Sequence, residues 1–190
     1  MEKKKTKKVT TPEFRASFPH LFEAHSFQEG QQKKYSIVML IPKTADISPL
    51  KEARKDAITQ KWPDPEKRPK PLRNPIRDGD VEKPDTDGYP GHYFITASSK
   101  QRPGVVDKNV QQIIDDSEFY AGCYARATVT PYAYDTMGNR GVAFGLQNVQ
   151  KLRDGDSFTG RSKAEDDFGV VSQDEDFGTD KIKEEEDMFE

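Results

Sequence analysis

The clearest pattern of polar and apolar positions lies between residues 123 and 134. Cys123, Ala125, Ala127 and Val129 occupy alternate positions, whereas tyrosine, arginine and threonine fill most of the positions between and beyond them. Successive side chains of a strand point to opposite faces of the sheet. The pattern therefore predicts a strand with a small buried face and a large polar face, which is typical of a tightly closed barrel.

Four other segments carry strand patterns and bring the predicted strands to about five: residues 14–22, 35–41, 92–98 and 142–146. Pro19 interrupts the first segment and predicts an edge or a bend, because proline lacks the amide that a ladder needs. The second segment is an apolar, β-branched run that predicts a buried strand. Gly138 and Asn139 predict a hairpin-like turn before the last segment.

A helix is predicted to begin near Ser48, whose side chain can cap the first free amides, and Pro49 suits the first helical position. A second, short helix is predicted around residues 110–114. In the first helix, the apolar residues recur at helical spacing and predict one buried face: Leu50, Ala53, Ala57 and Ile58, with Trp62 at its end.

Together these elements predict a mainly β fold, an OB-fold-like five-stranded barrel with one or two helices. A closed barrel removes the free strand edges that an open antiparallel sheet would leave, but an open α+β sheet remains the alternative. Between residues 63 and 91 the chain holds seven of its 13 prolines, and five Lys or Arg lie between residues 67 and 77. This stretch is predicted to be a long basic loop.

Charge is divided unevenly along the chain. Residues 164–190 contain 12 Asp or Glu and two Lys, whereas residues 1–163 contain 28 Lys or Arg and 21 Asp or Glu. Only 33% of all residues are apolar, which is low for a chain that folds throughout. We therefore expect a flexible basic N-terminal arm (1–11), one folded domain (12–163) and a disordered acidic tail (164–190).

Several classes of function find no support in the sequence. Cys123 stands alone, and His20, His25 and His92 lack a metal-ligand spacing, so no disulfide, metal site or cofactor is expected. No phosphate-binding glycine loop or nucleophile motif is present, so we do not expect an enzyme. The longest apolar run, residues 37–41, is too short to span a membrane, and we expect a soluble protein of a reducing compartment.

The polar face of residues 123–134 predicts nucleic-acid binding. Unpaired bases stack on aromatic rings, while arginine and threonine bind phosphate without reading the sequence. Basic residues near the ends of the predicted strands would form the rims of a groove. The tyrosines could instead be covered by the predicted helix and belong to the core. The candidate DNA contacts are Lys33, Lys34, Lys43, Arg73, Arg77, Phe94, Lys100, Arg102, Tyr124, Arg126, Tyr132, Tyr134 and Arg140.

Six segments carry a resemblance through their order along the chain: TPEFRASFPHLFEA (11–24), KYSIVMLIPK (34–43), PIRDGD (75–80), GHYFITASSK with RPGVVD (91–107), FYAGCYARA (119–127) and GVAFGLQNVQKLRDGD (141–156). In this order they resemble phage single-stranded-DNA-binding proteins that have an OB-fold and an acidic C-terminal tail. The resemblance covers most of residues 11–167. It implies sequence-independent coating of single-stranded DNA in phage replication and recombination, in the cytoplasm of the infected bacterial host.

The acidic tail is predicted to regulate that binding. As a coil of 27 residues it would span about 30 Å, enough to reach a groove on the domain and compete with DNA. The resemblance implies contacts with replication proteins such as a polymerase or helicase, and self-association is left open. The acidic tails of similar single-stranded-DNA-binding proteins finish on an aromatic residue, whereas here Glu190 follows Phe189. The predicted partner-binding segment is Glu184, Glu185, Glu186, Asp187, Met188 and Phe189.

A different class of function also fits the charge pattern. In a protein-interaction adaptor or a DNA-mimic inhibitor, the acidic tail would bind basic partners and the folded domain would serve as a scaffold. Binding to single-stranded DNA separates the two hypotheses.

Overall fold

The structure is a computed structural model that describes residues 7–160 and Phe168. The chain divides into two units, Met1–Gly160 and Arg161–Glu190, and every helix and strand described lies in the first. Apart from Phe168, the predicted acidic tail lies outside the described residues, as do residues 1–6 of the predicted arm.

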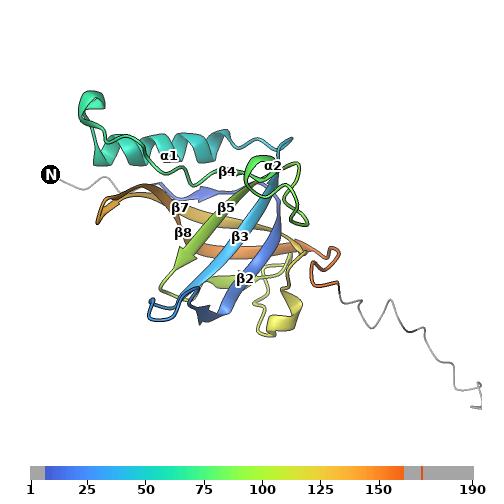
Figure 1. Ribbon diagram of the computed structural model, residues 1–190. Helices are drawn as coiled ribbons and strands as arrows, with labels where there is room; N and C mark the ends of the chain where they lie inside the picture. The colour runs from blue at the N-terminus through green and yellow to red at the C-terminus, as the bar shows by residue number, and fades with distance from the viewer. Residues whose placement is uncertain (1–6, 161–167, 169–190) are drawn as a thin grey trace, which may run out of the picture. The chain divides into compact units, whose positions relative to one another are not determined.

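Five long strands pair in a closed circuit (Figure 1). β2 pairs with β3, β3 with β5, β5 with β8, β8 with β7, and β7 with β2. The β5–β8 pairing is parallel and the others are antiparallel. The mainly β, OB-fold-like barrel is therefore confirmed, and the open sheet is not formed. The long strands are β2 (Phe14–His25), β3 (Lys34–Pro42), β5 (His92–Ser99), β7 (Tyr124–Thr136) and β8 (Asn139–Arg153).

Shorter elements extend this barrel. α1 packs against β7, β8 and β1, and lies above the barrel strands in the view of Figure 1. The short elements are β1 (Val9–Thr10), β4 (Arg77–Asp78) and β6 (Gly104–Val106), the helices α1 (Ser48–Lys61) and α2 (Gly79–Glu82), and the 3-10 helices η1 (Pro65–Lys67) and η2 (Asp116–Glu118). Within the described residues, no helix is long and apolar enough to cross a membrane.

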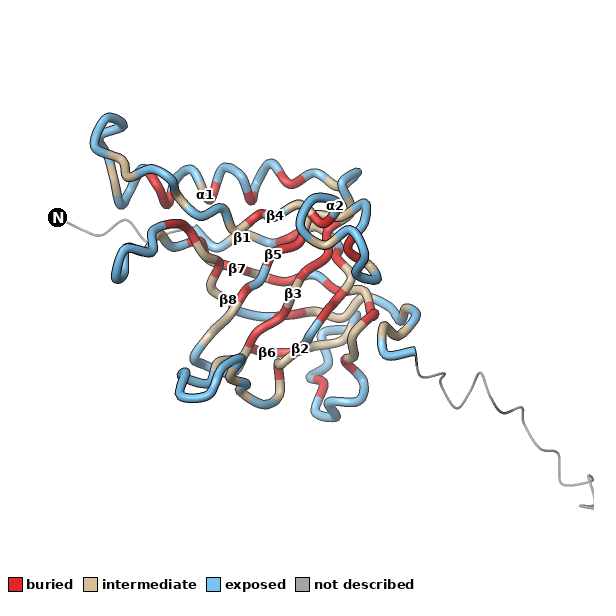
Figure 2. The backbone as a smooth tube through the Cα atoms, in the orientation of Figure 1, coloured by how far each residue is buried: buried red, intermediate tan, exposed pale blue. Residues whose placement is uncertain are grey.

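The barrel interior is filled by the small face that the sequence predicted on β7. Cys123, Ala125, Ala127 and Val129 are all buried, and inward residues of β2, β3, β5 and β8 complete the core (Figure 2). Burial raises the pKa of the Cys123 thiol to about 11. The thiol therefore stays protonated at neutral pH and serves as a small core side chain.

The predicted buried face of α1 is confirmed, but its cap is not. Leu50, Ala53, Ala57 and Ile58 are buried, and the last two pack with residues of the β7–β8 hairpin. Ser48 does not cap the helix. Instead, Asp46 Oδ1 accepts a hydrogen bond from the Ser48 amide, and its hydrogen bonds with Ser48 lower the pKa of Asp46. Asp46 thus satisfies the Ser48 amide, while the amides of Leu50 and Lys51 donate to Ile47 O.

Two other expectations are corrected. The basic arm does not extend to residue 11, because Val9 and Thr10 pair with β7 and the Thr11 amide donates to Ala127 O. An edge of β7 offers free backbone groups that this segment satisfies. No helix forms at residues 110–114. There the Asp107 carboxylate accepts the amides of residues 109 and 111, and this turn replaces the predicted helix.

Candidate nucleic-acid interface

The outer side of the barrel carries a floor of small side chains on β3 and β5. Ser36 lies opposite Ser98 and Val38 opposite Thr96 in the antiparallel register. The intervening residues Ile37, Met39, Ile95 and Ala97 point into the core, so the first four point outward. We call Ser36, Val38, Thr96 and Ser98 the β3–β5 surface.

A tyrosine flanks this surface on the β8 side. Ser98 lies beside Gly145 of β8, which has no side chain, and a Cβ at Gly145 would lie 3.9 Å from Tyr132 Cε1. The Tyr132 ring is therefore placed over Gly145, and Tyr132 is 44% exposed. Burial, followed by the neighbouring Tyr134, raises the pKa of Tyr132, so its hydroxyl is neutral at physiological pH.

An aromatic cluster flanks the β2 side. His20 lies opposite Ser36, and its ring stacks on His25 with the ring centroids 4.4 Å apart and the planes 11° from parallel. Phe27, in the loop between β2 and β3, meets both imidazoles edge-on at 6.0 and 5.5 Å. Phe27 is 64% exposed, although phenylalanine is among the residues most often buried in proteins.

Basic residues gather at the same end of the strands. Lys34 lies opposite His25, and the start of β3 lies beside the end of β5, so Lys33 and Lys34 come close to Lys100 (Figure 1). Within the described residues, no ion pair involves any of these three lysines. The guanidinium of the nearby Arg102 lies 5.6 Å from the centroid of the Phe22 ring. We call this region the open end: His20, His25, Phe27, Lys33, Lys34, Lys100 and Arg102.

The opposite end of the outer face of β3 and β5 is covered. Phe94 is only 2% exposed because Tyr89 packs edge-on against it, with centroids 5.1 Å apart, and both contact Leu40. Phe94 was predicted to contact DNA, but its ring is buried by the segment that precedes β5. Arg77, also a predicted contact, lies 4.6 Å above the same ring and pairs with Glu82.

Lys43 is neutralised at this covered end. Its Nζ lies 2.7 Å from carboxylate oxygens of both Asp78 and Asp80, and hydrogen bonding to these groups raises the pKa of Lys43 and lowers theirs. Gly79 is required between them, because a Cβ there would lie 2.1 Å from Tyr89 O. Lys43 was predicted to bind phosphate, and in the structure two carboxylates already occupy its ammonium group. We call this region the closed end: Leu40, Lys43, Arg77, Asp78, Asp80, Glu82, Tyr89, Phe94 and Phe158.

The start of β7 has its polar face covered in a similar way. The guanidinium of Arg153 lies 3.6 Å from the centroid of the Tyr124 ring, and Arg153 also pairs with Glu13. Tyr124 therefore offers no free ring face on that side. Arg126 donates to Gln150 Oε1 at 2.8 Å and lines a cavity of about 290 Å³ on β7 and β8. Along the strand, Arg126 and Tyr132 are six positions apart, which is about 20 Å.

Three predicted contacts remain, and they lie in or beside the β7–β8 hairpin: Arg73, Tyr134 and Arg140. Tyr134 is half-buried and lies opposite Gly141. Arg140 Nε donates to Asp135 Oδ1 at 3.1 Å across the hairpin, and this ion pair partly neutralises it. Arg73 pairs through its backbone with Gly141, where any Cβ would lie 2.7 Å from Arg73 O. Both residues therefore lie beside the hairpin and not on the β3–β5 surface.

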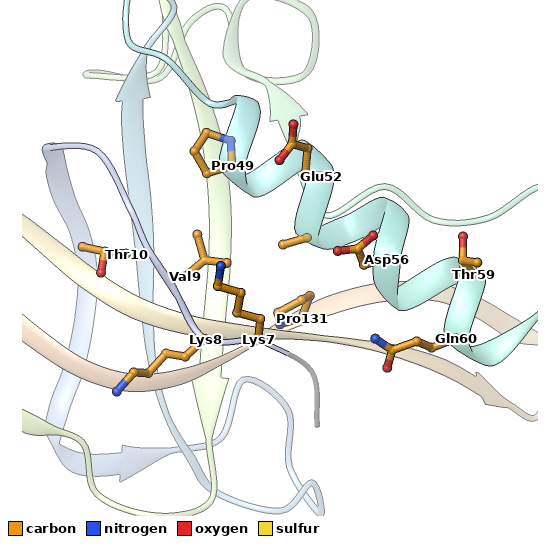
Figure 3. A pocket seen from close by; sticks show the side chains of 11 residues that line it. Lys7, Lys8, Val9, Thr10, Pro49, Glu52, Asp56, Thr59, Gln60 and Pro131 are labelled. Carbon is orange, nitrogen blue, oxygen red and sulfur yellow. The ribbon is translucent and has the colours of Figure 1, made fainter. Parts of the chain in front are cut away.

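A larger cavity, of about 660 Å³, lies between β1 and α1 (Figure 3). Lys7 and Lys8 line one side, while Glu52 and Asp56 of α1 line the other. The two carboxylates would repel phosphate, which makes this cavity a poor site for a nucleic-acid backbone. Within the described residues, no group of three or more His, Cys, Asp or Glu could hold a metal ion.

Sequence reasoning missed the cluster of His20, His25 and Phe27. The two histidines were judged only by metal-ligand spacing, and Phe27 is a single aromatic residue in a polar loop. The sequence feature that could have identified Phe27 was its position in a loop between two predicted strands, because loops at strand ends border the binding face of an OB-fold.

The closed barrel and its open end define an OB-fold protein with a candidate nucleic-acid interface. A model of the family described as "Enterobacter phage Enc34, ssDNA-binding protein" matches residues 7–178. The chain belongs to this family. It is also 36% identical, over 182 residues, to protein p50 of Acyrthosiphon pisum secondary endosymbiont phage 1, covering 88% of this chain and 97% of that protein.

Solved structures share the fold. The single-stranded DNA-binding protein of bacteriophage Enc34 in complex with ssDNA is 24% identical, with a TM-score of 0.69 over 80% of this chain and 89% of that one. A C-terminal truncation of the Enc34 protein is 25% identical, with a TM-score of 0.62 over 79% and 87%. The single-stranded DNA-binding protein gp2.5 of bacteriophage T7 is 14% identical, with a TM-score of 0.56 over 91% and 99%.

Proposed function

We propose that this protein binds single-stranded DNA without sequence preference, along the β3–β5 surface and the open end. The observation that carries the proposal is a floor of small side chains between the exposed rings Phe27 and Tyr132. At one end lie lysines that form no ion pair with any described residue. OB-folds bind oligonucleotides on the equivalent strands and flanking loops. Membership of the Enc34 ssDNA-binding family supports the same conclusion.

Each part of the surface has a distinct role in this proposal. Phe27 and Tyr132 stack on bases, each worth about 1–3 kcal/mol, and every base has a ring face to offer. Lys33, Lys34 and Lys100 neutralise phosphates and release condensed counterions. The hydroxyls of Ser98 and Thr96 are small enough to let a strand lie flat on the floor. None of these contacts requires a particular base, so the binding is independent of sequence.

A titration with fluorescently labelled oligo-dT at two salt concentrations tests the proposal. We expect the logarithm of the affinity to fall with the logarithm of the salt concentration, with a slope of roughly −0.7 for each phosphate neutralised. Weak binding that does not depend on salt would contradict the proposal and favour the adaptor hypothesis. A Mg²⁺-supplemented digestion assay on the same oligonucleotide checks the expectation that the protein is not an enzyme.

We further propose that residues 164–190 compete with DNA for this surface. The segment carries 12 acidic residues against two lysines, and the open end carries unpaired positive charge. Deleting residues 164–190 is then expected to tighten oligo-dT binding. Replacing them with a neutral Ser/Gly tail of equal length should tighten binding as well, because the charge of the tail, and not its bulk, causes the competition. An unchanged affinity after deletion would contradict this role of the tail.

Displacement by DNA would free the tail for protein partners during phage replication or recombination in the host cytoplasm. Met188 and Phe189 are an apolar pair among acids and are the proposed anchor. Binding of a purified replicative polymerase or helicase should weaken when both are replaced by serine. Equal binding by the two forms would remove the proposed anchor.

A further inference from the structure

Ser36 presents an unusual polar group on the β3–β5 surface. It lies on the outer face of the barrel, yet it is only 2% exposed, and among the described residues its Oγ has no hydrogen-bond partner. A buried hydroxyl without a partner loses its hydrogen bonds to water and gains none in return, so such groups are uncommon. Its cross-strand neighbours are Ser98, which is small, and His20, which is large enough to cover it.

The ring of His20, the cross-strand neighbour of Ser36, packs against a second imidazole. His20 and His25 stack in parallel at 4.4 Å, and Phe27 packs edge-on against both. Two imidazolium ions at this separation would repel each other, so the stack disfavours double protonation. Burial, and then the charge of His25, lower the pKa of His20. The closed stack therefore stabilises a neutral His20.

The charged groups around the pair favour an anion. Lys33 and Lys34 lie at the start of β3, and Lys100 follows β5, while Glu23 on β2 and Glu29 in the loop are the nearby acids. Carboxyl and ammonium side chains in general change charge well outside the range from pH 6 to pH 8. Within that range, the two imidazoles are the groups at the open end whose charge can respond to a bound phosphate.

We propose that the cluster of His20, His25 and Phe27 is a cover over Ser36 that opens and takes up protons when single-stranded DNA binds. This inference rests on the proposed function. In the bound state the two imidazoles separate, each faces a phosphate as the imidazolium ion, and the Ser36 hydroxyl gains the DNA as its hydrogen-bond partner. The protons come from solvent, so the complex holds more protons than the free protein and DNA.

Proton uptake makes the affinity depend on pH. Each proton taken up on binding strengthens the affinity by up to about tenfold for each unit of pH decrease. We therefore expect oligo-dT binding to tighten by about 3- to 30-fold between pH 8 and pH 6 at constant ionic strength. A surface that bound DNA through lysines alone would show little change over this range.

The experiment measures oligo-dT affinity of the full chain at pH 6, 7 and 8 for the wild type and two variants. His20→Gln together with His25→Gln removes both titrating groups and is expected to abolish the pH dependence. His92→Gln is the matched control, because His92 lies at the opposite end of β5 and its Nδ1 is 2.8 Å from Pro90 O. This control is expected to keep the wild-type dependence.

A second measurement avoids reliance on variants. The imidazole proton signals of the wild type are titrated with and without oligo-dT, and the midpoints of His20 and His25 are expected to rise on binding while that of His92 does not. Tight binding with no pH dependence, or a dependence retained by the double variant, would overturn the inference and leave the proposed function standing. Absence of binding at every pH would overturn both.

Discussion

The open end and the closed end share the outer face of β3 and β5 and are built from the same kinds of residue. Both combine aromatic rings with lysine or arginine. At the closed end, Arg77 lies over Phe94 and pairs with Glu82, while Lys43 is held by two carboxylates. At the open end, within the described residues, the lysines have no acidic partner, and Phe27 keeps most of its surface exposed.

The difference shows that residue type does not decide which end binds a ligand. A cation that is already paired has little to gain from a phosphate, because an existing partner must be given up. A ring that is already buried cannot accept a base without unpacking its neighbours. We therefore propose that DNA binds at the end whose groups remain unsatisfied.

The largest effect on stability is expected when a buried side chain of the closed end is truncated. Phe94→Ala removes a buried ring that packs with Tyr89 and Leu40, and it should lower the free energy of unfolding by about 3–5 kcal/mol. Denaturant melts measure this loss. The matched change Phe27→Ala at the open end should cost little stability, because that ring is already in water. Similar losses in both variants would contradict the distinction between the two ends.

The next effect concerns affinity. Phe27→Ala should weaken oligo-dT binding by about 1–3 kcal/mol, because a stacking platform is lost, and Tyr132→Ala should weaken it by a similar amount. Fluorescence anisotropy provides the measurement. Ile114→Ala serves as the control, since Ile114 is an exposed apolar residue away from this surface. Full affinity in both aromatic variants would show that the rings do not hold bases.

A smaller effect separates the lysines of the two ends. Lys33→Gln should reduce the slope of log affinity against log salt by about 0.7, because one phosphate contact is removed. Lys43→Gln should leave that slope unchanged, since Asp78 and Asp80 already neutralise Lys43. Equal changes in the two slopes would mean that Lys43 leaves its carboxylates to bind DNA.

The smallest effect is the acid dependence of stability. Hydrogen bonds from Lys43 lower the pKa of Asp78 and Asp80 in the folded state, so their contribution is present above the unfolded pKa near 4 and is lost as the pH falls through the folded pKa. Asp78→Asn with Asp80→Asn should therefore flatten the decline of Tm below pH 4. The side chains are well exposed, so the change is small. An unaltered decline would show that the cluster does not contribute.

Local patterns predicted the fold well. The alternation on residues 123–134, the apolar run that became β3 and the helical stripe of α1 each depend on neighbours in sequence, and all three are confirmed. Ser48 was a reasonable cap by residue type, but Ile47 O accepts the amides of Leu50 and Lys51, and the Ser48 amide itself donates to Asp46. The boundary of β1 escaped prediction because it depends on an edge of β7, which is distant in sequence.

The site was harder to predict than the fold. Phe94 and Lys43 were predicted as DNA contacts from their residue types and positions. Their partners, Tyr89 and the Asp78–Asp80 turn, are brought to them only by the folded chain, so the sequence did not reveal that they are paired. Tyr124 is covered by Arg153, which follows it by 29 residues and reaches it through the β7–β8 pairing. Whether a group has a partner is a property of the folded chain, and a pattern of residue types does not contain it.

Amide chemical-shift mapping with oligo-dT tests the central claim most directly. The account predicts that the largest changes fall on Ser36 and Ser98 of the β3–β5 surface and on Phe27 and Gly145 beside it. Changes concentrated instead on Arg126, Thr128 and Gln150, on the outer side of β7 and β8, with Ser36 and Ser98 unaffected, would contradict it.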